Sequence, residues 1–261
     1  MKIRTGTLRE MKAKGQRISA LTSYDAITAE IFDQAGIEVI LVGDSASNVV
    51  LGNKDAIAIS LADMVSFGRA VASSAKSALV VLDLPFGSYE VSPQQALENA
   101  IYAMKETGVA AVKLEGPKLD QIRALTSNGI PVMGHVGFTP QSVNALSGYK
   151  VQGRGENAER IMQECLDIED AGAFAIVLEM VPAVLAEQIT AKLTVPTIGI
   201  GAGPNCDGQI LVWTDFAGLS KKVPSFVKRY LELNELLTQA AIDYREEIQS
   251  GSFPPVEKNF S

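Results

Sequence analysis

Three carboxylates in this sequence each stand at the end of a short apolar run. Asp44 follows VILVG, Asp83 follows ALVVL and Glu115 follows AAVKL. Carboxylates that lie close together repel one another unless a cation neutralises them. Oxygen ligands, in a chain with one histidine and two cysteines, favour a hard ion such as Mg²⁺ over Zn²⁺. If the fold gathers these three carboxylates, we expect them to bind a divalent metal; a metal-free carboxylate cluster is the alternative.

A lysine accompanies the third carboxylate. Lys113 stands two residues before Glu115, and side chains alternate along a strand, so the two should share one face. Beside a metal, the ammonium group would face the negative charge of a substrate. Two other roles stay open for Lys113: a Schiff base with a carbonyl substrate, or a structural ion pair with Asp83 or Glu115.

Two more ionisable residues end apolar runs further along the chain. His135, in GHVG, is the one histidine of the chain, and its place at a strand end favours hydrogen bonding to a substrate over packing in the core. Glu179 follows AIVL, so it should be partly desolvated, with a raised pKa suited to a general base. A structural ion pair of Glu179 with Arg154 or Lys150 is the alternative.

The elements that must position these residues repeat along the chain. Eight runs are almost wholly apolar, which is typical of parallel strands covered on both faces. They are residues 18–24, 39–45, 78–85, 110–116, 130–137, 173–180, 195–203 and 209–216. Eight strands alternating with helices predict a single (β/α)₈ barrel, with a doubly wound sheet as the alternative. In a barrel, the carboxyl ends of all strands meet at one face, so the candidate residues would converge there.

Helical spacing separates most of these runs. The expected helices are Asp25–Ala35, Ser60–Ser74, Ser92–Glu106, Leu119–Ser127, Glu156–Asp170, Ala183–Leu193 and, last, about Ser225–Ile248. Serines predict two of the starts and glycines three of the stops. These capping residues are Ser60, Ser92, Gly36, Gly108 and Gly172. We expect one barrel domain over residues 1–261, with a C-terminal helical extension and tail from about 222 to 261.

The composition narrows the class of protein. The net charge is −7, and an acidic chain is poorly suited to nucleic acid or to an anionic membrane surface. Two cysteines cannot build a disulfide framework or a four-cysteine zinc site. The first residues lack the apolar segment of a signal peptide, and the apolar runs are too short to span a membrane. We therefore expect a soluble, cytoplasmic protein.

Several long motifs resemble one known family. They are LTSYDAITAEIFDQAG, VILVGDS, DLPFGSY, VKLEG, GIPVMGHVGFTPQSVNALSGYKVQGR, GAFAIVLEMVP and VPTIGIGAGPNCDGQILVWTDFAG. Together they resemble the ketopantoate (3-methyl-2-oxobutanoate) hydroxymethyltransferases. The resemblance implies the (β/α)₈ barrel of the phosphoenolpyruvate/pyruvate superfamily, Mg²⁺ as cofactor and a homo-oligomer, typically a decamer. The implied reaction passes a one-carbon unit from 5,10-methylenetetrahydrofolate to 3-methyl-2-oxobutanoate, through a Mg²⁺-stabilised enolate, giving 2-dehydropantoate for pantothenate biosynthesis.

Matched motif by motif, the resemblance also assigns roles to residues. The aspartate of GDS, the aspartate of DLPF and the glutamate of KLEG would hold the metal; they are Asp44, Asp83 and Glu115. Substrate contacts fall on Asp44, Ser45, Asp83, Lys113 and His135. Glu179, in VLEM, matches the proton acceptor.

The chain departs from the family pattern at two places. Residues 51–60, LGNKDAIAIS, lack the threonine pair and the proline of the usual loop, and the tail ends in EKNFS. Neither departure removes an expected ligand, although the first could alter substrate preference. Two other functions stay as alternatives: a Mg²⁺-dependent lyase or mutase of the same superfamily, for which the same carboxylates would serve, and a non-catalytic keto-acid-binding or assembly protein.

Overall fold

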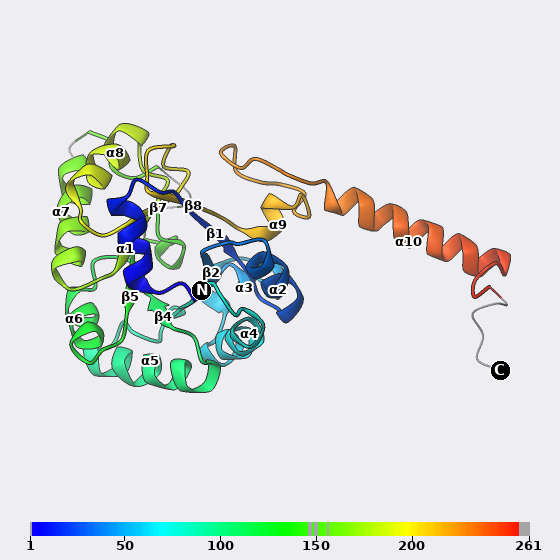
Figure 1. The fold of residues 1–261 in the computed structure, drawn as a ribbon, viewed down its shortest axis with the longest axis horizontal. Coiled ribbons are helices and arrows are strands. Elements are labelled where there is room, and N and C mark those ends of the chain that lie inside the picture. Colours follow the sequence, from blue (N-terminus) through cyan, green and yellow to red (C-terminus); the bar gives the residue numbers. More distant parts are fainter. Residues whose placement is uncertain (1, 146–147, 149–150, 156, 256–261) are drawn as a thin grey trace. The chain divides into compact units, whose positions relative to one another are not determined.

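Eight parallel strands close into a barrel in the computed structural model of this chain, which describes residues 2–145, 148, 151–155 and 157–255 (Figure 1). The strands are β1 Ile18–Thr22, β2 Val39–Val42, β3 Leu79–Asp83, β4 Ala111–Lys113, β5 Val132–Gly137, β6 Ala175–Glu179, β7 Thr197–Ile200 and β8 Gly208–Leu211. Each strand pairs with the next in the sequence, and β8 closes the ring on β1. The predicted (β/α)₈ barrel is confirmed, and the doubly wound sheet is wrong.

Helices between the strands surround the barrel (Figure 1). They are α2 Ala26–Gln34, α3 Ala46–Val49, α4 Leu61–Ser74, α5 Pro93–Thr107, α6 Leu119–Ser127, α7 Asn157–Asp170 and α8 Ala183–Lys192, with short 3₁₀ turns η1 Ala56–Ala58 and η2 Pro140–Ser142. Two of these helices begin at the serines that the sequence predicted. The Ser60 hydroxyl accepts a hydrogen bond from the Asp63 N–H at the start of α4, and the Ser92 hydroxyl accepts one from the Gln95 N–H at the start of α5. Gly108 ends α5 in the left-handed region, as its lack of a side chain allows.

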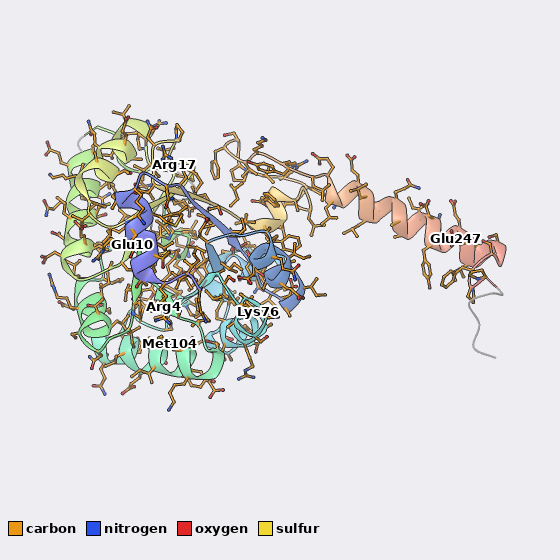
Figure 2. All side chains as sticks on the ribbon, in the orientation of Figure 1. Arg4, Glu10, Arg17, Lys76, Met104 and Glu247 are labelled. Carbon is orange, nitrogen blue, oxygen red and sulfur yellow. The ribbon has the colours of Figure 1, made fainter. Side chains whose placement is uncertain are left out.

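A helix that the sequence analysis did not predict covers the amino ends of the strands. This helix, α1 (Thr5–Ala13), crosses the barrel in Figure 1; Figure 2 labels Arg4 just before the helix, Glu10 on it and Arg17 in the segment that follows. Leu8 is fully buried among strand residues such as Val39 and Ile198. The apolar interior is thereby closed at the face opposite the candidate site.

Lys12, on α1, makes the polar contacts that hold this helix against the amino ends of the strands. Its ammonium group lies 2.9 Å from Asp207 Oδ2 and also donates to the carbonyls of Thr190 and Val195. Asp207 in turn accepts from the backbone N–H of Thr197 at the start of β7. The contacts join α1 to the segments that lead into β7 and β8.

Replacing Lys12 by methionine should destabilise the protein. The change leaves Asp207 partly buried without its cation, and two carbonyls lose a donor, so we expect a loss of about 2–4 kcal/mol in the free energy of unfolding. Urea denaturation of both proteins would measure it. Lys14→Met is the matched control, because Lys14 is exposed. Its Nζ lies 3.9 Å from Glu10 Oε2, and an exposed ion pair of this kind contributes little to the free energy of unfolding. Equal losses in the two variants would contradict this role for Lys12.

Residues Trp213–Ser261 form a second compact unit, separate from Met1–Val212. It contains α9 (Trp213–Phe216) and α10 (Leu233–Ser250). Two predictions are corrected here: the eighth strand ends at Leu211 and gives way to α9, and the last helix begins at Leu233 rather than near Ser225. Within residues 225–232, the Tyr230 N–H donates to the Phe216 carbonyl and not to the residue four positions earlier, as a helix would require. That the whole chain folds as one domain stays a prediction.

Within the described residues, no helix combines the length and the apolar character needed to cross a lipid bilayer.

Candidate active site

The predicted residues of β2, β3 and β4 meet at the carboxyl ends of these strands. Asp44, Asp83, Lys113 and Glu115 are all at least 95% buried. The Asp44 N–H donates to Asp83 Oδ2 over 3.2 Å, which ties the two metal-ligand candidates together. As the alternation along β4 predicted, Lys113 and Glu115 lie on one side, with 3.9 Å between Lys113 Nζ and Glu115 Oε1.

Lys113 is paired with Asp83 in a short charged hydrogen bond between Nζ and Oδ1. Burial alone would lower the pKa of Lys113, but Asp83, Glu115 and Asp44 together raise it above its ordinary value. The ammonium form is therefore stable at neutral pH. A Schiff base needs the neutral amine, so this environment favours an electrostatic role for Lys113.

His135 stands between two carboxyl groups. Its Nδ1 lies 3.4 Å from Glu115 Oε1, and its Nε2 lies 3.4 Å from Glu179 Oε2. Burial, and then the charge of Lys113, lower the pKa of His135 well below its ordinary value, so the ring is neutral. Among the described residues, both ring nitrogens and Glu115 Oε1 lack a hydrogen-bond partner. Buried polar atoms of this kind are costly, and they are typical of a site that receives a ligand.

Glu179 is held by its backbone at the end of β6. The Phe138 N–H donates to the Glu179 carbonyl over 2.8 Å. Gly137 allows this approach, since a Cβ there would lie 2.2 Å from the same carbonyl oxygen. The next residue, Met180, has a φ of 50°, a strained value for a side chain of this kind. Burial, and then the nearby Glu115, raise the pKa of Glu179 well above its ordinary value.

Of the alternatives for Glu179, Lys150 lies outside the described residues. The titratable side chain that lies beside Glu179 is the neutral His135, whose Nε2 is 3.4 Å from Glu179 Oε2. Glu179 also differs from the three other carboxylates in exposure, because its side chain keeps 17% of its surface accessible. It is thus the carboxyl group of the site with the most open approach.

Ser45, the remaining predicted substrate contact, begins the short helix α3. Its hydroxyl is within 2.8 Å of the Tyr24 hydroxyl, which comes from the end of β1. The neighbouring Gly43 packs closely against the site: a Cβ there would lie 2.9 Å from Ser45 Oγ and 3.7 Å from Asp83 Oδ2. The lack of a side chain at Gly43 therefore lets Ser45 and Asp83 approach this backbone.

Sequence reasoning missed two buried residues of the site, Gln141 and Tyr89. The Gln141 side chain donates to Asp44 Oδ2 over 2.9 Å, and its backbone N–H donates to Glu115 Oε2 over 3.0 Å. The Tyr89 hydroxyl donates to the Gln141 side-chain oxygen. Both residues stand in motifs that carried the family resemblance, GFTPQ and DLPFGSY, and that was the available signal.

The donor set fits a hard divalent cation. Four carboxyl groups converge here on one ammonium group, that of Lys113. Burial, and then repulsion from Asp83 and Glu115, raise the pKa of Asp44 well above its ordinary value, and a cation bound beside it would oppose both effects. Across the part of the chain that the structure describes, no three His, Cys, Asp or Glu side chains are already closed around a metal position. Lys113 lies between Asp83 and Glu115, so a cation bound by these carboxylates would share them with the ammonium group.

The sequence profile of the ketopantoate hydroxymethyltransferase family matches residues 2–256. This chain belongs to that family. A 3-methyl-2-oxobutanoate hydroxymethyltransferase of Leifsonia xyli subsp. xyli (strain CTCB07) is 53% identical to this family member, over 99% of the chain and 95% of the relative. The protein of the same name from Mycobacterium tuberculosis (strain ATCC 25618 / H37Rv) is 54% identical, over 99% and 93%. The chain is therefore a hydroxymethyltransferase, as the motifs predicted.

Solved structures share the barrel fold of this ketopantoate hydroxymethyltransferase family member. Phosphonopyruvate hydrolase in complex with oxalate and Mg²⁺ aligns with a TM-score of 0.62 at 16% identity, covering 99% of this chain and 92% of that protein. 2,3-Dimethylmalate lyase, of the PEP mutase/isocitrate lyase superfamily, aligns with a TM-score of 0.59 at 17% identity, covering 100% and 93%. At such identities the likeness concerns the barrel alone.

Proposed function

We propose that this protein transfers a hydroxymethyl group from 5,10-methylenetetrahydrofolate to 3-methyl-2-oxobutanoate, giving 2-dehydropantoate and tetrahydrofolate. The observation that carries the proposal is the convergence of Asp44, Asp83, Lys113, Glu115, His135 and Glu179 at one barrel face, within a chain about half identical to relatives of that name. Further parts of the proposal are a place in pantothenate biosynthesis, the cytoplasm as location and a homodecameric assembly.

Asp44 and Asp83 would hold Mg²⁺ directly, and Glu115 directly or through water. Two observations support this assignment: four carboxyl groups converge beside one ammonium group, and Glu115 Oε1 accepts no hydrogen bond within the described residues. When bound, the cation supplies Lewis-acid stabilisation of the charge that develops on the ketone oxygen, an effect worth several kcal/mol.

The other residues bind the keto acid and move its proton. The ammonium group of Lys113 and the hydroxyl of Ser45 would bind the carboxylate and ketone oxygens. Glu179, with a raised pKa and an open approach, would remove the proton from C3. The resulting C3 nucleophile would bond to the methylene carbon as one of its two C–N bonds to folate breaks. Water would then replace the second nitrogen on that carbon, which gives the hydroxymethyl group. The two protons released, one from C3 and one from water, end on the nitrogens of tetrahydrofolate. The neutral His135 would donate a hydrogen bond to the substrate or the product.

The first test is proton exchange at C3 of 3-methyl-2-oxobutanoate in D₂O, followed by NMR with and without Mg²⁺ and without folate. We expect loss of the C3 proton signal only when protein and metal are both present. Addition of methylenetetrahydrofolate should then give 2-dehydropantoate. Turnover of an oxaloacetate-type or isocitrate-type substrate without folate would instead support the lyase or mutase. Binding of the keto acid with neither exchange nor turnover would support the non-catalytic alternative.

Mg²⁺ should stabilise the fold more at high pH than at low pH. Burial, together with repulsion from Asp83, raises the pKa of Glu115 from 4.5 to about 7. Because the folded pKa is raised, the contribution of this group to stability is present below pH 4.5 and is lost as pH rises to about 7. A cation replaces the lost proton, so the gain from Mg²⁺ should grow over that window, to about 3 kcal/mol at a hundredfold excess over Kd. Thermal unfolding with and without Mg²⁺ at both ends of the window measures this. Equal gains at the two ends would contradict it.

A further inference from the structure

Gln141 donates hydrogen bonds to two of the carboxylates of the site, Asp44 and Glu115. It lies in η2, after β5, and is 4% exposed. Its Nε2 donates to Asp44 Oδ2 over 2.9 Å and to the Leu84 carbonyl over 3.1 Å. Its backbone N–H donates to Glu115 Oε2 over 3.0 Å. Gln141 thus fixes one oxygen of Asp44, which follows β2, and one oxygen of Glu115, which follows β4.

Tyr89 fixes the direction of the Gln141 amide. The Tyr89 hydroxyl accepts the Glu115 N–H over 3.3 Å, so its own proton goes to Gln141 Oε1. The opposite amide orientation would place an oxygen against the Leu84 carbonyl, with no proton between the two oxygens. Every bond in the chain from Glu115 through Tyr89 and Gln141 to Asp44 therefore has one donor and one acceptor.

We propose that Gln141, oriented by Tyr89, is a positioning residue that turns the carboxylates of Asp44 and Glu115 toward a divalent cation. The inference rests on the proposed function in one respect, that these carboxylates are cation ligands. The bonds from Gln141 hold Oδ2 of Asp44 and Oε2 of Glu115, and the other oxygen of each carboxylate stays outside these contacts. In Glu115 that other oxygen, Oε1, has no hydrogen bond within the described residues.

The test is the affinity of the substrate-free protein for Mn²⁺. Full-length wild type, Gln141→Ala and Tyr89→Phe would be stripped of metal and titrated with Mn²⁺, with free Mn²⁺ followed by electron paramagnetic resonance. Loss of a partner of a metal ligand weakens binding by about 10- to 100-fold, and we expect this rise in Kd for Gln141→Ala. Tyr89→Phe should shift the Kd in the same direction by a smaller factor, because Gln141 remains but its amide is no longer oriented.

Two controls match the variants in chemistry. In Gln163→Ala, the lost amide donates over 2.8 Å to an aspartate on α7, away from the site, and in Tyr102→Phe the lost hydroxyl is exposed. Both should keep the wild-type Kd. For Gln141→Ala, excess Mg²⁺ should also restore much of the C3 exchange, which a purely structural defect would not allow.

Unchanged Mn²⁺ affinity in Tyr89→Phe and in a folded Gln141→Ala overturns the inference, as does a wild type that binds no Mn²⁺. If Gln141→Ala does not fold, an unchanged Kd in Tyr89→Phe alone overturns it. A wild type that binds Mn²⁺, with weakened binding in both variants but no C3 exchange or turnover, supports the inference and refutes the proposed reaction.

Discussion

Asp83→Asn is expected to abolish Mg²⁺-dependent proton exchange at C3 of the keto acid. Asparagine keeps the shape of the side chain and an oxygen that can accept the Asp44 N–H, but it removes the negative charge. In the proposed site, that negative charge attracts the cation and also pairs with the ammonium group of Lys113. Without the cation, the developing charge on the ketone oxygen loses several kcal/mol of stabilisation, so the exchange rate should fall about a thousandfold or more.

NMR of the keto acid in D₂O measures this loss, and thermal unfolding shows whether the variant keeps its fold. Asp167→Asn is the matched control, because Asp167 also accepts a side-chain hydrogen bond, from Gln163 on the same helix, and lies outside the site. It should exchange the proton at the wild-type rate. Wild-type exchange by folded Asp83→Asn at limiting Mg²⁺ would show that Asp83 is not a metal ligand.

The parts of the fold that depend on local chemistry could be read from the sequence. Ser60 and Ser92 begin α4 and α5 as predicted, because a hydroxyl that accepts a backbone N–H is a local interaction. The apolar runs located the strands for a similar reason, since strands covered on both faces have few polar positions. The candidate site followed from the barrel itself, because parallel strands bring the residues at their carboxyl ends to one face.

Contacts between distant segments account for what the sequence did not predict. The helix α1 is mostly polar, and its burial of Leu8 against the strands becomes visible only in the folded chain. Tyr230, which precedes α10, donates its N–H to the Phe216 carbonyl instead of to the preceding turn of a helix. Gln141 and Tyr89 were missed because loop geometry, rather than residue type, brings them to Asp44 and Glu115. The strained φ of Met180, beside Glu179, likewise has no signature in its residue type.

Glu179→Gln is expected to remove C3 proton exchange while leaving the affinity for Mn²⁺ close to that of the wild type. Glutamine cannot accept the proton, and loss of a general base costs about a hundredfold to ten-thousandfold in rate.

The wild-type rate should rise with pH, because burial and Glu115 raise the pKa of Glu179 and the active form of a base is unprotonated. Glu187→Gln, on α8, is a control that should exchange normally. Exchange in Glu179→Gln at the wild-type rate and with the wild-type pH profile would assign the proton transfer to another group. Retained Mn²⁺ binding would separate this variant from Asp83→Asn, because one change removes the proton acceptor and the other removes a cation ligand.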